Sequence, residues 1–471
     1  MIIDGKKIIS KKVFNVVNPF TKTIVGKAID ASYKHIRQAV EKSYNFQCLL
    51  SSKERSKILS KTRIQLKKNK EYFAKIITSE SGLSFKDSIY EIDRVINCAN
   101  YSIKACKIID RDITSDFVFD KKNQPKLKVI TEPLDLIVAI TPFNHPMNLV
   151  AHKIFPAIVA GTSVVLKPSE KTPLSAIKLV EILHNNGMPP NMVNVVTSKN
   201  GKNVLNKILS YSKLDLLTVT GSLRAGLDIK KSLVKKGHSL IKYIPELGGC
   251  SSLIVCSDAD LIKATKIILN GCFKNSGQRC TSIRRVIADK EIVDKLIHIL
   301  LRKVNKIKYG NPFQKNTDLG TIIDEESAIK IQKKIKSAIK NGAKLLYGNI
   351  KRGALLSPTI LDKVKVDMDL VATETFGPVC PIIRSNNFEE ALKIAKKTGY
   401  MLAGAIVTKD KSKAEKACKY LKVGQFNFNG PPGYRTEVAP FGGFGNSGNG
   451  EKEGILLAAK SMRRIRTFYK H

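Results

Sequence analysis

Long apolar runs, paired cysteines and acidic side chains are scarce in this chain of 471 residues. No apolar run reaches the roughly 20 residues that a membrane-spanning helix needs. The N-terminal stretch MIIDGKKIISKK also lacks the charged, apolar and small-residue order of a secretion signal. We therefore expect no membrane association and a cytoplasmic protein.

The nine cysteines have irregular spacing and form no CxxC pair. This pattern excludes a disulfide framework, predicts no metal site, and is typical of a reducing compartment. Most of these residues should be small buried hydrophobic side chains. Cys280 differs, because it follows Gly277-Gln278 and stands beside Arg279 in the polar stretch NSGQRCTS.

Acidic residues number 40 against 81 lysines and arginines, which gives a formal net charge of +41. Such an excess also occurs in nucleic-acid-binding proteins. Here, however, lysines are spread along the whole chain, and the sequence has no RNP-type run and no interleaving of arginines with aromatics. We therefore predict a lysine-rich solvated surface, which can help to attract anionic substrates, and no nucleic-acid partner. A non-catalytic basic binding protein is the alternative of a different class.

The chain is too long for a single hydrophobic core. Apolar residues three and four apart predict helices between about 30 and 110, and residues 113–134 are predicted to form a hairpin with a polar turn at KKNQ. Two blocks of alternating β-rich and helical runs follow, which meet near ELGG at 246–249. This alternation predicts an α/β protein with two lobes, each a parallel sheet covered by helices.

Four segments combine Pro or Gly with a reactive or hydrogen-bonding side chain where a β-like run ends: TPFNHP (141–146), LKPSE (166–170), ELGG (246–249) and NSGQRCTS (275–282). Loops at the carboxyl ends of strands form the binding crevice of open α/β sheets. With ETFGP (374–378) and PFGG (440–443), these segments follow the motif order of the aldehyde dehydrogenase superfamily, which the whole chain resembles.

The resemblance implies a three-part organisation. A Rossmann-like NAD-binding domain would comprise residues 1–112 and 138–246, and a catalytic domain residues 247–449. Residues 113–137 and 450–471 would form a β-hairpin oligomerisation arm, which implies a homodimer or homotetramer.

By the same resemblance, Cys280 is the nucleophile that attacks an aldehyde carbonyl to give a thiohemiacetal and then a thioester. Arg279 beside it could favour the thiolate. Asn144 would stabilise the negative charge that develops on the substrate oxygen. Glu246 would activate the water that hydrolyses the thioester, so the expected product is a free acid.

The resemblance also implies NAD(P)+ bound without a GxGxxG motif. NAD is expected rather than NADP, because a carboxylate at Glu170 should hydrogen-bond a free ribose 2′-hydroxyl and repel a 2′-phosphate. The residues expected to contact the cofactor are Thr141, Pro142, Phe143, Lys167, Ser169, Glu170, Gly221, Ser222, Gly226, Leu247, Gly248, Glu374 and Phe376.

Arginines suggest an anionic aldehyde as substrate, since a forked guanidinium matches phosphoryl oxygens. Members of the superfamily that oxidise phosphorylated or phosphonylated aldehydes carry matching arginines. Phosphonoacetaldehyde is the expected substrate, and glyceraldehyde 3-phosphate, lactaldehyde or a semialdehyde is the alternative. The residues expected at the substrate are Arg94, Arg279, Arg435, His152 and Thr281. Structural ion pairs for Arg94 and Arg435, and a packed helix position for His152, remain open alternatives.

Three positions depart from the superfamily's motifs. Cys250 stands where ELGGK has Lys, Gly445 stands where PFGGxKxSG has Lys, and Val219 replaces the Phe of FTGS. None of these departures removes a chemical role. The first two could alter interface packing or cofactor affinity.

Overall fold

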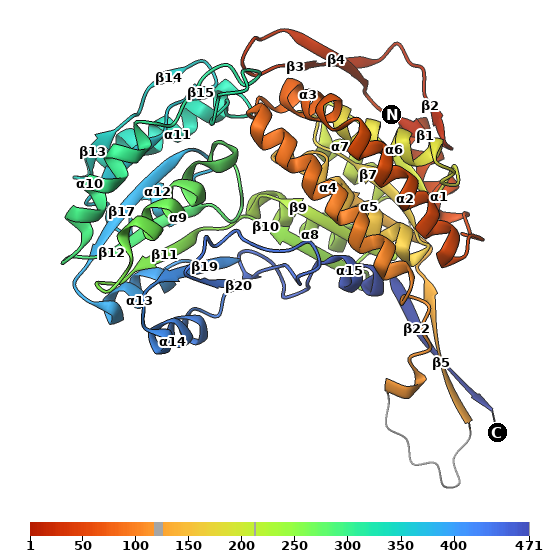
Figure 1. Cartoon of the computed structure of the whole chain (residues 1–471). Helices are drawn as coiled ribbons and strands as arrows, with labels where there is room; N and C mark the ends of the chain where they lie inside the picture. The colour runs from red at the N-terminus through yellow and green to blue at the C-terminus, as the bar shows by residue number, and fades with distance from the viewer. Residues whose placement is uncertain (117–125, 212, 471) are drawn as a thin grey trace.

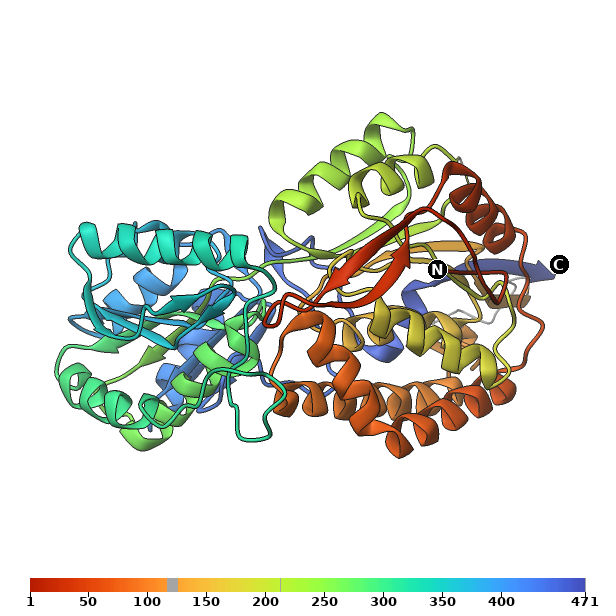
Figure 2. The same cartoon turned by 90° about the horizontal axis from the view of Figure 1, so that it is seen from above.

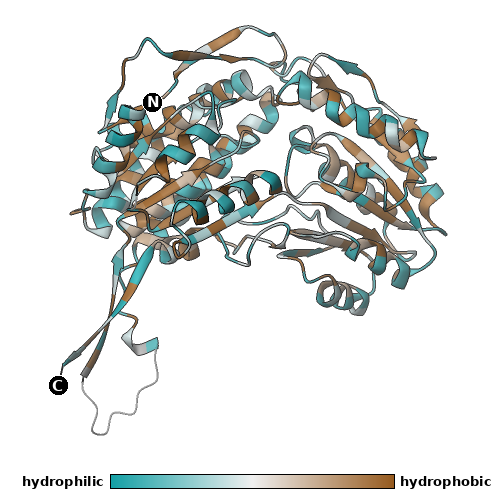
Figure 3. Ribbon diagram, turned by 180° about the vertical axis from the view of Figure 1, so that it is seen from behind, coloured by the Kyte–Doolittle hydropathy of each residue, from teal (hydrophilic) through white to brown (hydrophobic). Residues whose placement is uncertain are grey.

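The computed structural model describes residues 1–116, 126–211 and 213–470. Two α/β lobes stand side by side, and each is built on a seven-stranded sheet (Figures 1 and 2). The central strands of both sheets are strongly apolar, and helices cover both sheet faces (Figure 3). The two-lobed α/β architecture predicted from the alternating pattern is confirmed.

The first sheet has five parallel strands and an antiparallel edge formed by the N-terminus. Its strand order is β10 (Lys242–Leu247), β9 (Leu216–Gly221), β6 (Leu136–Ile140), β7 (Ser163–Lys167), β8 (Val193–Val195), β1 (Ile2–Ile3) and β2 (Lys6–Lys7). In the parallel register, Ile140 lies opposite Lys167 and Glu246 lies opposite Thr220. The predicted motifs at the ends of these strands therefore meet at one edge of the sheet.

Helices enclose the first sheet on both faces, each through its own apolar cluster. One face packs against α1 (Tyr33–Tyr44), α7 (Gly201–Ile208) and α8 (Leu223–Lys235). The other face packs against α2 (Ser52–Lys68), α3 (Lys70–Ser81), α4 (Phe85–Cys106), α5 (Asn148–Ala160) and α6 (Leu174–Asn185). A ribbon of β3 (Val13–Val17) and β4 (Ile24–Ile29), which the apolar pattern did not predict, lies outside this sheet.

The second sheet is parallel except at one edge strand, β13. Its order is β13 (Lys344–Tyr347), β16 (Thr359–Asp362), β17 (Val379–Ser385), β12 (Ile283–Asp289), β11 (Ser251–Val255), β19 (Ala403–Val407) and β20 (Gln425–Phe428). One face packs against α9 (Leu261–Phe273) and α10 (Val293–Val304). The other packs against α11 (Glu325–Lys340), α12 (Asp369–Ala372), α13 (Phe388–Lys396) and α14 (Lys411–Leu421).

A two-stranded antiparallel ribbon projects away from both lobes (Figure 1). It pairs β5 (Lys126–Pro133) with the C-terminal strand β22 (Arg463–Lys470). The predicted KKNQ turn and residues 117–120 before it lie outside the described residues, so the hairpin stays a prediction. The strand β5 pairs with β22, which the sequence did not predict. The arm is also shorter than predicted, because β6 begins at Leu136 and α15 (Ile455–Ser461) packs on α5 of the first lobe.

No helix in the described part of the chain is long and apolar enough to cross a membrane. Six of the cysteines are buried as expected, Cys48 and Cys280 are partly buried, and Cys418 is exposed. Within residues 1–116, 126–211 and 213–470, no three His, Cys, Asp or Glu side chains are grouped to bind a metal ion.

Candidate active site

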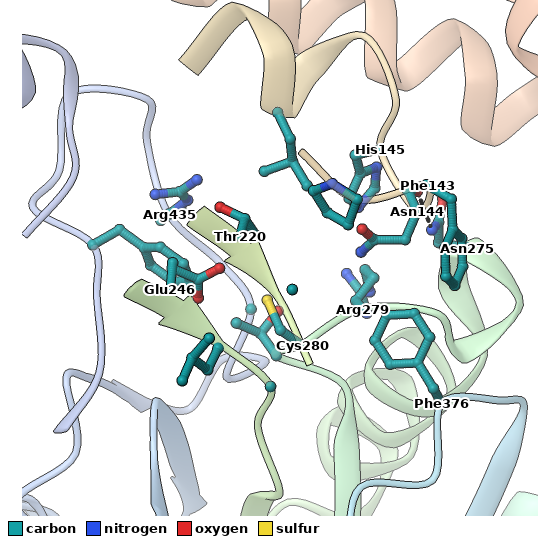
Figure 4. A pocket seen from close by; sticks show the side chains of 18 of the residues that line it. Phe143, Asn144, His145, Thr220, Glu246, Asn275, Arg279, Cys280, Phe376 and Arg435 are labelled. Atoms are coloured by element: carbon teal, nitrogen blue, oxygen red, sulfur yellow. Dashed lines mark hydrogen bonds between the residues drawn. The ribbon is translucent and has the colours of Figure 1, made fainter. Parts of the chain in front are cut away.

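A cavity of about 300 Å³ opens between the two lobes, where the carboxyl ends of β9 and β10 face the loop that carries Cys280 (Figure 4). The first lobe contributes the segment after β6 and the start of α4, and the chain around residue 435 closes one side. Fifteen predicted site residues border this cavity: Arg94, Pro142, Phe143, Asn144, Gly221, Ser222, Glu246, Leu247, Gly248, Arg279, Cys280, Thr281, Glu374, Phe376 and Arg435.

The loop before the nucleophile has an unusual backbone. Asn275, Ser276 and Gly277 have positive φ angles of 60°, 52° and 69° in succession. Only glycine adopts this region without strain, so the two non-glycine residues must be held there by their surroundings. A Cβ on Gly277 would lie 2.1 Å from the Gly377 carbonyl oxygen, which explains why this position is glycine.

Buried polar side chains hold this loop in place. The Gln278 amide accepts from Ile323 N at 2.9 Å and donates to Thr321 O at 3.2 Å. Asp87 accepts the Asn275 backbone N–H at 2.9 Å. Arg284, only 1% exposed, donates to the carbonyl oxygens of Gly277, Arg279 and Gly377. The loop can therefore present Cys280 with little freedom to move.

The Cys280 thiol lies between Glu246 on one side and Asn144 on the other (Figure 4). Burial raises its pKa well above the usual value, and the carboxylates of Glu246 and Glu374 raise it further, whereas Arg435 and Arg279 oppose them. The charge of Arg279 therefore favours the thiolate, as expected, but burial and the two carboxylates outweigh it. The Arg279 guanidinium also donates to the Asn270 carbonyl oxygen at 2.7 Å.

Glu246 ends β10 with its carboxyl group inside the cavity and only 3% of the residue exposed. Burial raises its pKa to about 8, and the charge of Glu453 adds to this effect. One of its oxygens, Oε1, has no hydrogen-bond partner among the described residues. A buried carboxyl group with a pKa near neutrality and an open lone pair is suited to act as a general base.

Behind Glu246 lies a buried polar group that sequence reasoning missed. Lys153, on α5, contacts the Glu453 carboxylate and donates to Thr218 Oγ1 at 2.6 Å. Glu453 itself borders the cavity. A Lys on an otherwise apolar helix was the available signal for this group, because a buried ammonium requires a partner.

The Asn144 side chain is buried next to the nucleophile loop. Its Nδ2 donates to the Gln278 carbonyl oxygen at 2.9 Å, which leaves the second N–H of that amide available. The backbone carbonyl of Asn144 in turn accepts from Asn275 Nδ2 at 3.0 Å. The side chain is thereby fixed at the cavity wall near Cys280, where a developing oxyanion would need a donor.

The three predicted substrate arginines differ in their pairing. Arg94 is bound to the Glu437 carboxylate through two hydrogen bonds, and Arg279 is bound to backbone carbonyl groups. Arg435 makes no hydrogen bond or ion pair to any described residue, and its guanidinium lies 3.8 Å from the centre of the Phe441 ring. Arg435 is thus the arginine most available to a ligand (Figure 4).

His152 does not border the cavity, contrary to its prediction as a substrate contact. It is 2% exposed on α5, and its Nε2 contacts the Glu437 carboxylate behind Arg94. A different histidine, His145, lines the cavity, and its Nδ1 lies 3.4 Å from the buried carboxylate of Glu91. Its place in the TPFNHP segment was the signal that sequence reasoning did not use.

Comparison with known proteins shows which family the chain belongs to. The profile of the aldehyde dehydrogenase family matches residues 7–468. The chain belongs to the aldehyde dehydrogenase family. It is 36% identical over 477 residues to a lactaldehyde dehydrogenase of Methanococcus aeolicus, covering 99% of both chains. It is 32% identical over 468 residues to a 3-sulfolactaldehyde dehydrogenase of Priestia megaterium, covering 99% of this chain and 96% of that one.

Among solved structures, the chain is similar to the glyceraldehyde-3-phosphate dehydrogenase GapN of Methanocaldococcus jannaschii in complex with NADP. The TM-score is 0.92 and the identity 34%, with 98% of this chain and 99% of that chain covered. The two-lobed architecture is therefore the aldehyde dehydrogenase fold, and the protein is an NAD(P)-dependent aldehyde dehydrogenase.

The cavity end near α8 brings together several of the residues expected to contact the cofactor. A Cβ on Gly221 would meet nothing closer than 4.0 Å, so the backbone at the start of α8 is open to a ligand. Glu374 Oε1 accepts the Gly249 N–H at 3.0 Å, and a Cβ on Gly248 would lie 2.3 Å from Glu374 Oε2. The rings of Phe143 and Phe376 pack edge to face, with an angle of 86° between their planes and 5.9 Å between their centres.

The remaining predicted cofactor residues lie outside this cavity. Thr141 directly follows β6, Lys167 is the last residue of β7, and Ser169 and Glu170 follow that strand. The Lys167 ammonium lies 3.2 Å from Glu170 Oε2. They border the same edge of the sheet, since Ile140 lies opposite Lys167. Gly226 has a packing role in the structure, because a Cβ there would lie 2.4 Å from Leu247 Cδ2.

Of the three departures from the motifs, Cys250 and Val219 are buried, and the Cys250 thiol donates to the Val371 carbonyl oxygen at 3.1 Å. Gly445 has a φ angle of 57°, which glycine adopts without strain.

Proposed function

We propose that this dehydrogenase uses NAD+ to oxidise a short aldehyde with an anionic tail to the corresponding carboxylate. The observation that supports an anionic tail is the unpaired guanidinium of Arg435 in the cavity that holds Cys280 and Glu246. An unpaired buried cation is costly, and a ligand anion would supply its missing partner.

In the first step, the Cys280 sulfur attacks the aldehyde carbon. The new carbon–sulfur bond turns the carbonyl oxygen into an oxyanion, and the thiol proton passes to Glu246. The Asn144 amide and the Cys280 backbone N–H stabilise the oxyanion. Because burial raises the pKa of the Cys280 thiol, proton removal has to accompany attack rather than precede it.

In the second step, the thiohemiacetal loses a hydride and becomes a thioester. NAD+, when bound, supplies the hydride acceptor. The chain's own contribution is to hold that acceptor with Glu374, Phe376 and the start of α8, and to keep Cys280 fixed.

Before the third step, Glu246 releases the proton of the thiol to solvent. It then takes a proton from water, and the resulting hydroxide attacks the thioester. The carbon–sulfur bond breaks, the thiolate of Cys280 is released and reprotonated, and the product leaves as a free acid. Glu246 is suited to this step because its pKa of about 8 makes it a stronger base than an exposed glutamate.

Phosphonoacetaldehyde and glyceraldehyde 3-phosphate both belong to the proposed substrate class. The names of the relatives support glyceraldehyde 3-phosphate, a sulfonated lactaldehyde or lactaldehyde itself, and none of them names phosphonoacetaldehyde. Lactaldehyde, which carries no charge, is the second candidate, because the relative at 36% identity is named for it.

The deciding experiment compares NADH formation with phosphonoacetaldehyde, glyceraldehyde 3-phosphate, lactaldehyde and propanal. For an anionic aldehyde we expect kcat/KM to exceed that for propanal by about 100-fold, and Arg435→Gln to remove most of this advantage without slowing propanal oxidation. Arg302→Gln, an exposed position on α10, is the matched control. Equal turnover of lactaldehyde, propanal and the anionic aldehydes would contradict the proposal.

We also propose that the β5–β22 ribbon joins subunits into a homodimer or homotetramer. Ile465, Phe468 and Tyr469 on β22 are each more than half exposed, and an isolated two-stranded ribbon is only marginally stable in water. Light scattering of Phe468→Glu should show a smaller species than the wild type. An unchanged oligomer, or a monomeric wild type, would exclude this role.

A further inference from the structure

Lys274 borders the same cavity as the three arginines, although no motif marked it. It follows α9 directly, is half-buried, and its ammonium lies 3.2 Å from the centre of the Tyr90 ring. No carboxylate of the described residues lies within 4.0 Å of it. Lys274 therefore joins Arg279 and Arg435 as a cation that borders the cavity without an ion-pair partner among the described residues.

Three of the cations that border this end of the cavity have no ion-pair partner among the described residues. Arg94 is neutralised by Glu437, which leaves Lys274, Arg279 and Arg435 without a paired carboxylate. Asp87 is the carboxylate whose charge acts on Lys274 and Arg279, and one of its oxygens already accepts the Asn275 N–H. The charges of Glu437, Glu453 and Glu246 act on Arg435, but none of them forms an ion pair with it. A ligand anion could therefore pair with each of these three cations.

The other titratable groups nearby form no ion pair with these three cations. Glu91 lies behind His145 and accepts the backbone N–H groups of Met147 and Asn148 at the start of α5. Burial lowers the pKa of His145, so it adds no positive charge at neutral pH. Lys153 contacts Glu453, and Glu374 accepts the Gly249 N–H. Glu246 and Glu453 act on Arg435 only through their charge, without an ion pair.

An anionic ligand would also favour the charged form of Lys274. Burial lowers its pKa to about 8; Asp87 opposes this effect, while the positive charges of Arg279 and Arg94 add to it. A ligand with negative charge at this position would stabilise the ammonium form.

We propose that Lys274, together with Arg279 and Arg435, makes this enzyme select aldehydes whose tail carries two negative charges over those whose tail carries one. The chemical class is therefore a phosphonate or phosphate monoester rather than a sulfonate or carboxylate. This inference rests on the proposed oxidation of an anionic aldehyde and specifies which anion the site prefers.

Phosphonoacetaldehyde and sulfoacetaldehyde form a matched pair for the test, because they differ only in the phosphonate or sulfonate group. At pH 7.5, we expect wild-type kcat/KM to be about tenfold higher for the phosphonate, as expected when one further charge pairs in a partly buried site. Lys274→Met should reduce this ratio to about two, mainly through KM for the phosphonate, and Lys274→Arg should restore it.

Lys104→Met is the matched control, since Lys104 also lies over a tyrosine ring on α4, that of Tyr101, but does not border the cavity. It should leave the ratio unchanged. Inhibition of the wild type by the products phosphonoacetate and sulfoacetate gives a second readout that needs no variant, and phosphonoacetate should bind about tenfold more tightly.

The outcomes separate this inference from the proposed function. If both anionic aldehydes exceed propanal by the same large factor, the proposed function stands and the selection by charge number is wrong. A ratio that stays at its wild-type value in Lys274→Met also overturns the role of Lys274. If propanal is oxidised as well as both anions, the proposed function fails, and this inference fails with it.

Discussion

Arg94 donates to both carboxylate oxygens of Glu437, from Nε to Oε1 at 2.6 Å and from Nη2 to Oε2 at 3.2 Å. Glu437 is 6% exposed at its side chain and also contacts His152. The predicted substrate arginines therefore differ: Arg94 is paired with a protein carboxylate, whereas Arg435 is free to bind a ligand. A sequence pattern cannot distinguish these roles, because both positions present the same side chain.

Removing one partner of this pair should destabilise the protein. Burial alone would raise the pKa of Glu437, but His152 and Arg94 outweigh it and hold that pKa well below the usual value. Arg94→Met would leave the carboxylate buried beside His152 alone, at a cost of about 3 kcal/mol. Thermal unfolding at pH 7 should show a clear drop in Tm, and Arg94→Met/Glu437→Gln should recover part of it.

The pH dependence of this contribution has a definite sign. Because the folded-state pKa of Glu437 is depressed, the pair stabilises the fold above the unfolded-state pKa of a glutamate, near 4.5. The contribution is lost as the pH falls below that value towards the folded-state pKa. The difference in Tm between wild type and Arg94→Met should therefore shrink between pH 6 and pH 3. A constant difference over this range would contradict an ionic origin.

Cys280→Ala should abolish aldehyde-dependent NADH formation, by at least about a thousandfold, because no other thiol borders the cavity in the described part of the chain. NAD+ binding, followed by protein fluorescence, should be retained. Cys418→Ala, at the exposed cysteine, is the control and should be fully active. Residual turnover in Cys280→Ala would exclude a covalent mechanism at this residue.

Glu246 should govern the pH profile of thioester hydrolysis. Its raised pKa of about 8 means that the basic, ionised form accumulates only as the pH rises through 8, so a hydrolysis-limited kcat should increase up to that pH and then level off. Glu246→Gln should lose steady-state turnover. Because Glu246 also takes the thiol proton in the first step, this variant should show no stoichiometric burst of NADH. A full burst would place the loss after hydride transfer and exclude a role of Glu246 in the first step.

Glu170 should set the preference for NAD+ over NADP+. Its carboxylate stands beside Lys167 at the end of β7, where a 2′-phosphate would meet negative charge. Glu170→Ser should lower the ratio of kcat/KM for NAD+ to that for NADP+ by about tenfold, mainly by improving NADP+. Glu181→Ser, on α6, is the control for losing a glutamate elsewhere in this lobe. If the wild type prefers NADP+, the proposed role of Glu170 in excluding NADP+ is wrong.

The central strands and most helices could be predicted from local sequence. The run LIVAI becomes β6, NLVAHKIFPAIVA becomes α5, and the loops that follow β6, β7 and β10 meet at one edge of the sheet. Prediction worked there because parallel strands in this fold are apolar throughout and their carboxyl ends share an edge. It was incomplete for the arm, where β5 pairs with β22, because pairing between strands more than 300 residues apart has no local pattern.

The sequence by itself determined the two-lobed α/β fold, the family and the choice of Cys280, Glu246 and Asn144 as the proposed reacting groups, because these depend on local periodicity and on residue types in motifs. Only the tertiary structure decided which cations are free. It paired Arg94 and His152 with Glu437, brought Lys274 to the cavity, and buried Cys280 so that its pKa rises. The physical reason is that charge pairing and desolvation depend on distances between residues from distant parts of the chain.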